Sequence, residues 1–264
     1  MKVFIITNSD PIKTIPFLKQ VIKARKGWVT GVAITDGNRL TINKKRSVVI
    51  YLLSLLLIMG PVHFIKNSMI SIQYKLFKTC SNYISFLKNS TFEGWLEKEK
   101  IPFKRIKSPN NNSFLAYLES QGIDLIINQS SAILKKELLD LPKIGIINRH
   151  NALLPKNRGR LTPFWVLYKG EEETAVSIHF VTEALDAGDI IVQKKIQVEK
   201  TDSFNDLVKK NYDVAPVAMI EALDKLHSGS DNYLPNKDEE ATYNSTPTFR
   251  DALRFRLKRL GIDK

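Results

Sequence analysis

Short apolar runs alternate with longer segments of helical periodicity along most of the chain. The apolar runs fall at residues 3–7, 28–34, 124–129 and 143–148, and a more basic segment at 101–107 is also predicted as a strand; each has the length of a β-strand. Segments with helical spacing lie between them, at residues 15–26, 91–100, 113–122 and 135–142. Strands and helices that alternate in this way predict an α/β fold with a Rossmann-like, mostly parallel sheet flanked by helices.

The later part of the chain has a different pattern. Residues 175–182 and 190–198 alternate between apolar and polar side chains, which is typical of an antiparallel strand pair. Asp202 and Ser203 then predict the start of a long helix to about His227, in which Pro216 is expected to cause a kink or a break. A loop-like segment, 232–248, leads to a basic helix at 249–261.

Residues 37–92 interrupt the regular alternation and predict a helical insertion. Within it, SVVIYLLSLLLIM (47–59) is a continuous apolar run that ends at Gly60-Pro61. A membrane span needs about 20 apolar residues, so we expect a buried helix here. An interfacial helix lying on a membrane or a partner is the main alternative, and a true span is the least favoured. From Pro61 to about Leu87 the pattern is helical and basic.

The net charge of +13 is concentrated in the first part of the chain. Residues 1–110 carry 19 basic and 5 acidic side chains, and no acidic residue lies between Asp36 and Glu93. Such a one-signed region attracts phosphates, RNA or anionic lipid, although a genome biased toward lysine would produce the same composition. Cys80 is the single cysteine, so no internal disulfide can form and a reducing cytosol is expected. The N-terminal apolar run is too short for a signal peptide.

Polar residues follow two of the buried runs, where ligands bind in open parallel sheets. Asn148 and His150 end the run at 143–148, and their spacing places both side chains on one face of an extended chain. An amide and an imidazole placed together can stabilise a developing oxyanion. Asp186, in the Gly-containing turn ALDAGDII (184–191), is a candidate third member that would manage protons.

The segments INRHNALLPKNRG (147–159) and TPFWVLYKGEEETAVSIHFVTEALDAGDII (162–191) resemble the core of the folate-dependent formyltransferases. The resemblance implies that Asn148, His150 and Asp186 are the catalytic trio, and that 10-formyltetrahydrofolate is the formyl donor. It implies no metal. On this basis residues 1–200 form the catalytic domain, with the insertion at 37–92, and residues 201–264 form a C-terminal helix and basic tail.

The resemblance also implies a donor pocket. Its predicted lining comprises Ile127, Gln129, Ser130, Ile133, Leu134, Val181 and Leu185. The bond between Leu154 and Pro155 is often cis in the family. Arg158 is expected to contact an acceptor phosphate, with a structural ion pair as the alternative. The sequence contains neither a GxxxxGK[ST] nor a GxGxxG motif, so ATP and NAD are not expected.

The sequence leaves more than one amine acceptor open. The segment TNSDPIKT (7–14) lacks the glycine found in the glycinamide ribonucleotide enzymes, which disfavours that acceptor. Only 66 residues follow Val198, too few for the extra domain of the tRNA enzymes. We therefore expect a nucleotide- or lipid-linked amino sugar of surface-polysaccharide synthesis. The alternatives are an aminoacyl-tRNA, or a catalytically silent folate- or RNA-binding scaffold.

The expected partners follow from these points. They are the amine acceptor, an anionic partner (nucleotide-sugar, tRNA or membrane surface) at residues 37–92, and a second copy in a homodimer. We expect a cytoplasmic protein, with attachment to the inner membrane face as an alternative.

Overall fold

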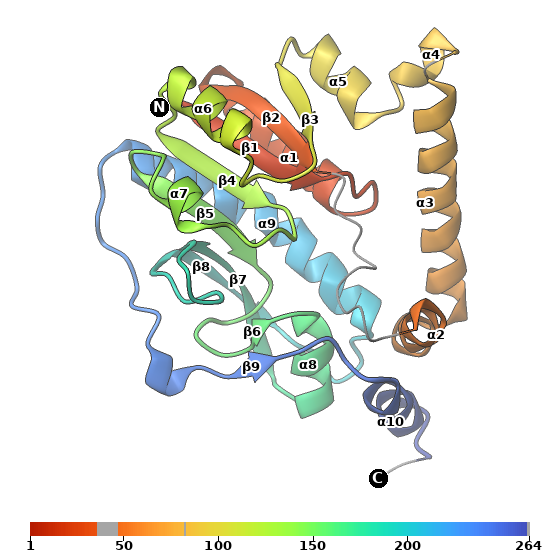
Figure 1. Ribbon diagram of the computed structural model, residues 1–264. Coiled ribbons are helices and arrows are strands. Elements are labelled where there is room, and N and C mark those ends of the chain that lie inside the picture. Colours follow the sequence, from red (N-terminus) through yellow and green to blue (C-terminus); the bar gives the residue numbers. More distant parts are fainter. Residues whose placement is uncertain (36–46, 82, 263–264) are drawn as a thin grey trace.

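The computed structural model describes residues 1–35, 47–81 and 83–262. Within these residues the main element is a seven-stranded sheet with the order β3-β2-β1-β4-β5-β7-β8 (Figure 1). The strands are β1 (Val3–Asn8), β2 (Val29–Thr35), β3 (Phe103–Ile106), β4 (Leu125–Gln129), β5 (Gly145–His150), β7 (Glu173–Phe180) and β8 (Ile190–Gln197). The first five pair in parallel, whereas β7 is antiparallel to both neighbours. This confirms the predicted fold class.

The central strands β1 and β4 are buried throughout because helices cover both faces of the sheet. Alternate residues of β1 point to opposite faces. Val3 and Ile5 belong to a cluster with residues of α1 (Thr14–Ala24) and α9 (Phe204–His227). Phe4 and Ile6 belong to a second cluster with residues of α6 (Asn112–Gln121) and α7 (Lys136–Leu139). Two layers of helix therefore enclose the sheet, as runs of consecutive apolar residues require.

Helix α9 begins at a capping box formed by Ser203 and Asp206 and runs through Pro216 as one element. The predicted break does not occur. Proline removes one backbone hydrogen bond, but Ala215, Met219 and Leu223 of the same helix are buried in the sheet's apolar cluster, and this packing offsets the loss.

A second, small sheet and two helices lie beside the main sheet (Figure 1). The sheet pairs β6 (Arg158–Gly159) with β9 (Tyr243–Asn244), and η3 (Asp238–Glu240) precedes β9. Helix α8 (Thr162–Lys169) was not predicted from the sequence pattern. Helix α10 (Phe249–Arg259) was predicted, and it begins at a second capping box. Phe164 of α8 and Phe255 of α10 share an apolar cluster with Ile58 of the insertion.

The part of the insertion between β2 and β3 that the structure describes is helical, as predicted. After η1 (Lys26–Trp28) and β2 come α2 (Val48–Met59), α3 (Pro61–Cys80), α4 (Ser85–Lys88) and α5 (Phe92–Lys98). The prediction that residues 47–59 are a buried helix is wrong in its burial, because only Ser54 and Ile58 of α2 are buried. Residues 37–46 of the predicted insertion lie outside the described residues. Among the helices that the structure describes, none has the length and apolar character needed to cross a membrane.

Candidate active site

Polar side chains from three neighbouring strands gather on the sheet face that carries α6 and α7. Asn128 of β4 pairs with Asn148 of β5, and Asn148 pairs with His179 of β7. Paired residues point to the same face, and His150 shares this face because it lies two residues after Asn148. The sheet therefore places Asn148, His150 and His179 together.

Asp186 reaches this group from the loop that joins β7 to β8. Its carboxylate accepts a hydrogen bond from the Gly159 backbone N–H at 2.8 Å, and Oδ2 lies 3.5 Å from Nδ1 of His150. The backbone at Asp186 is left-handed, with φ of 48°, a conformation that aspartate tolerates. A Cβ at Gly188 would lie 2.1 Å from the Phe180 carbonyl oxygen, so the loop needs glycine there. The three predicted catalytic residues are thus brought together.

Both ring nitrogens of His150 face acceptors. Nε2 lies 2.8 Å from the backbone oxygen of Asn157, and because a carbonyl only accepts, Nε2 carries a proton. Nδ1 faces the Asp186 carboxylate, 3.5 Å from Oδ2. The imidazole is almost completely buried, so its orientation is determined by these two contacts.

Asn157 holds the carbonyl that orients His150, and the sequence analysis missed it. The residue is fully buried and adopts a left-handed φ of 60°. Its side-chain oxygen accepts from Lys169 and Asn244, both at 2.7 Å, while its amide group donates to Glu171. No local pattern predicts this role, because the partners come from two other segments, around residues 169–171 and at Asn244.

His179 contacts the other oxygen of Asp186. Its Nδ1 donates to the Phe180 carbonyl at 2.7 Å, and its Nε2 lies 3.6 Å from Oδ1 of Asp186 without a hydrogen-bond partner. Burial lowers the pKa of His179 to about 4, a shift that Asp186 opposes and His150 reinforces. His179 is therefore neutral at pH 7, with an unprotonated nitrogen directed at the carboxylate. The Asp186 carboxylate lies between two imidazoles, those of His150 and His179.

Gln129 determines which end of the Asn148 amide is available. The Gln129 amide donates to Oδ1 of Asn148 at 3.0 Å, and its own oxygen accepts from Nε of Arg149 at 3.1 Å. The guanidinium of Arg149 lies over the rings of Phe17 and Tyr212 and is held in place. Because Oδ1 of Asn148 is occupied, its NH₂ group is the part that can donate to a reacting oxygen.

The predicted donor pocket is only partly assembled. Ile133 and Leu185 have exposed side chains, at 86% and 58%, whereas Leu134 and Val181 pack in the same apolar cluster and bring their two loops together. The two exposed apolar side chains, Ile133 and Leu185, lie on these adjoining loops. Ser130 lies beside them and donates through its backbone N–H and its hydroxyl to Asn128.

The prediction that Ile127 lines this pocket is wrong. Its side chain is fully buried and belongs to the cluster on the opposite face of the sheet, with α1 and α9. Strand alternation explains the difference, because Ile127 neighbours Asn128, which points to the site.

Arg158 is a structural residue, which corrects its predicted contact with an acceptor phosphate. The side chain is fully buried, and its guanidinium donates to Asp238 at 2.6 Å and to the Tyr243 hydroxyl at 2.8 Å. It also donates to the backbone and side-chain oxygens of Asn236, both at 2.9 Å. The bonds tie β6 to the segment around η3 and β9, so the ion pair given as the alternative is the one formed.

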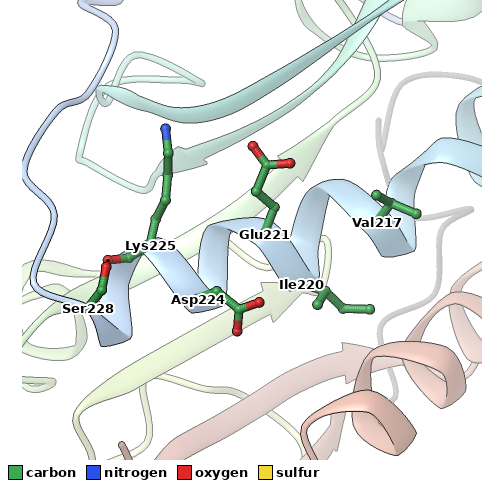
Figure 2. A pocket seen from close by; sticks show the side chains of 6 residues that line it. All are labelled: Val217, Ile220, Glu221, Asp224, Lys225 and Ser228. Atoms are coloured by element: carbon green, nitrogen blue, oxygen red, sulfur yellow. Dashed lines mark hydrogen bonds between the residues drawn. The ribbon is translucent and has the colours of Figure 1, made fainter.

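A shallow hollow of about 660 Å³ lies along the outer face of α9 (Figure 2). None of the candidate site residues described above lines it. All its lining residues belong to α9 or its C-cap. Its charged groups already have partners, since Glu221 pairs with Lys194, Asp224 with Arg25, and Lys225 with the Ile191 carbonyl. It is the groove beside a helix rather than a ligand site. Within the described ranges, no cluster of His, Cys, Asp and Glu side chains could hold a metal ion.

Comparison with known proteins identifies the class to which this fold and site belong. The formyl transferase family matches residues 88–223, which is half of the chain, so the chain belongs to this family. It is 38% identical over 148 residues to a methionyl-tRNA formyltransferase of Thermotoga maritima, a match that spans 56% of this chain and 47% of that protein. It is also 39% identical over 114 residues to a bifunctional polymyxin resistance protein of Wigglesworthia glossinidia brevipalpis, across 43% of this chain and 17% of that protein.

Solved structures share the fold. A phosphoribosylglycinamide formyltransferase from Bacillus halodurans superposes with a TM-score of 0.60 at 17% identity, over 88% of this chain and 98% of that one. A sugar N-formyltransferase from a Shewanella species gives a TM-score of 0.59 at 17% identity, over 97% and 88% of the two chains. The chain spans about half the length of the curated relatives it matches.

Proposed function

We propose that this chain transfers a formyl group from 10-formyltetrahydrofolate to a primary amine. The observation that carries the proposal is the Asp186–His150 pair beside the free NH₂ group of Asn148, in a chain of the formyl transferase family. Exposed Ile133 and Leu185 provide apolar surface for the folate rings. The donor, when bound, supplies the formyl carbon and a nitrogen that leaves with a proton.

Asn148 and His150 stabilise the negative charge that develops on the formyl oxygen. The Asn148 amide donates a hydrogen bond, and the polar His150 ring lies beside it in a buried, weakly screened site. Removing one such donor costs about 3–4 kcal/mol of transition-state stabilisation, or roughly 10²–10³-fold in kcat.

Asp186 receives the proton that the attacking amine must lose. The neutral His179 directs an unprotonated nitrogen at Oδ1 of Asp186, so a proton placed between the two is shared by two acceptors. The His150 ring faces the other oxygen of this carboxylate. Proton transfer by a placed carboxylate contributes about 10²–10⁴-fold to the rate.

For the acceptor, the curated relatives support the tRNA alternative better than the amino-sugar acceptor expected from the sequence. Those matching at 32–38% identity over about half of this chain include several named methionyl-tRNA formyltransferases. The named sugar enzymes are related by fold alone, at 17% identity or less. We therefore propose methionyl-tRNA as the first acceptor to test and nucleotide-linked amino sugars as the second.

The test is formyl transfer from 10-formyltetrahydrofolate to an acceptor panel. The panel holds methionyl-tRNA, uncharged tRNA, and nucleotide-linked 3-amino and 4-amino sugars. We expect turnover with one amine that falls at least roughly 100-fold in His150→Ala and is unchanged in His227→Ala, a surface histidine of α9. Folate binding without transfer to any acceptor, and equal in both variants, would support the scaffold alternative instead.

A further inference from the structure

Helix α3 carries a row of exposed apolar side chains along its outer side. The row recurs at intervals of three and four residues, which places all its members on one face of the helix. Every one is more than half exposed: Val62, Ile65, Met69, Ile72 and Leu76. The helix has 20 residues, none of them buried, and at 1.5 Å per residue the row from Val62 to Leu76 is about 21 Å long. We call these five residues the α3 stripe.

The opposite side of α3 faces the protein. Tyr74 packs against the main apolar cluster, and its hydroxyl accepts a hydrogen bond from the Phe92 backbone N–H at 3.2 Å. At the foot of α3, the helix α2 is held by Arg256 and Asn205, which donate to its Leu57 and Met59 carbonyls, both at 2.8 Å. These contacts hold α3 at one side of the molecule (Figure 1), and the stripe residues are exposed there.

Positive charge borders the stripe. At 100° per residue, Lys66 and Lys75 lie roughly 80–100° from the centre of the stripe, one on each side. Both side chains are exposed, and the chain has no acidic residue between Asp36 and Glu93. An apolar stripe flanked by lysines is the pattern of a helix that lies flat in a bilayer surface, with its cations among the lipid headgroups.

A second copy of the chain fits the stripe less well. Two α3 helices in contact would bring Lys66 and Lys75 together with no carboxylate on either helix, and like charges repel. Two stripes of this size would also bury on the order of 1,000 Å², below the ~1,600 Å² of a standard protein interface. RNA is not favoured either, because phosphates do not cover an apolar row.

We infer that the α3 stripe, with Lys66 and Lys75, docks the protein on the surface of an anionic lipid bilayer. Since α3 is not long and apolar enough to cross a membrane, the helix lies on the surface. Five exposed apolar residues of α2, at the foot of α3, extend the apolar surface: Val48, Val49, Ile50, Leu52 and Leu53. The inference is independent of the proposed reaction, because it uses none of the active-site residues.

The test is co-sedimentation of the full chain with vesicles of phosphatidylcholine, with and without phosphatidylglycerol. We expect binding only when phosphatidylglycerol is present, and weaker binding at high salt. Ile65→Gln/Ile72→Gln should reduce binding by more than about tenfold. The matched control is Val217→Gln, which removes an apolar side chain of α9 that is 60% exposed, and it should bind as the parent does.

Two further double variants test the contribution of the lysines. Lys66→Gln/Lys75→Gln should weaken binding about fivefold per lysine. Lys107→Gln/Lys237→Gln, which removes two exposed lysines elsewhere, should have little effect. Circular dichroism melting checks that each variant is folded. A fluorophore on Cys80, the single cysteine, at the end of α3 on the side of the stripe, should shift to the blue when vesicles are added.

Three results would overturn the inference. The first is vesicle binding that survives Ile65→Gln/Ile72→Gln. The second is a dimer that does not bind vesicles and that becomes a monomer in this variant, which would make the stripe a self-interface. The third is a loss of tRNA binding in the variant without any vesicle binding by the parent, which would make it an RNA surface.

Discussion

The buried, neutral His179 makes the stability of the protein depend on pH in a calculable way. A histidine with a pKa near 6.5 in the unfolded chain and about 4 in the fold binds more protons when unfolded between these values. The free energy of unfolding therefore falls as the pH falls from about 6.5 toward 4, and this contribution is absent above pH 7. The linkage relation gives a loss of about 2 kcal/mol at pH 5 and about 3 kcal/mol at pH 4 from this one side chain.

The perturbation is His179→Asn, which removes the titrating group. At pH 7 the variant should be less stable than the parent, because the bond to the Phe180 carbonyl and the packing of the ring are lost. As the pH falls to 5, the stability difference between variant and parent should shift by about 2 kcal/mol in favour of the variant. Urea unfolding of both proteins at pH 7, 6 and 5 measures this difference.

Taking the difference between the two proteins removes the contributions of other groups. Asp124 and Asp206, for example, have pKa values lowered mainly by hydrogen bonds, and they destabilise both proteins alike as the pH falls. His63→Gln, at an exposed position of α3, is the control for loss of a histidine. A parent-minus-variant curve that stays flat between pH 7 and 5 would mean that His179 is not buried in its neutral form.

Three further predictions concern the loop, the buried arginine and the donor surface. Gly188→Ala should lower kcat/KM by about 100-fold. The added Cβ would meet the Phe180 oxygen and displace the loop that holds the Asp186 carboxylate. A wild-type rate would contradict this geometry. Arg158→Ala should lower the free energy of unfolding by about 2–3 kcal/mol in urea, because several buried hydrogen bonds are lost; a change below about 0.5 kcal/mol would contradict its structural role. Ile133→Ser should raise the KM for the folate donor several-fold with stability unchanged within about 0.5 kcal/mol, as expected for an exposed side chain that meets only ligand; an unchanged KM would exclude it from the pocket.

The sequence predicts the sheet well because consecutive residues along the chain are enough to indicate each strand. A strand covered on both faces must be apolar throughout, and each buried run becomes a strand within two or three residues of the expected ends. The missed helix α8 had a signal of its own, because Pro163 stands at its second position, where a helix tolerates proline. Pro216 led to the wrong prediction of a helix break, because packing elsewhere along α9 determines its conformation.

The site was predictable only where its members follow one another along the chain. Asn148 and His150 could be placed on one face by their spacing, and alternation could also have shown that Ile127 points to the other face. Asn157, by contrast, matters because Glu171, Lys169 and Asn244 surround it. Such a role depends on contacts between distant segments, which a single sequence does not reveal.

The order of strands in the sheet has a consequence for how the protein is made. Strand β1 lies at the centre, yet one of its two neighbours, β4, begins about 120 residues later. At the ribosome's rate of about 5–20 residues per second, this mostly apolar strand waits roughly 6–24 s for that partner. Nearly half of this delay comes from the insertion that contains α2 and α3. The insertion with the α3 stripe therefore lengthens the period in which the nascent chain exposes an open strand edge, where aggregation can begin.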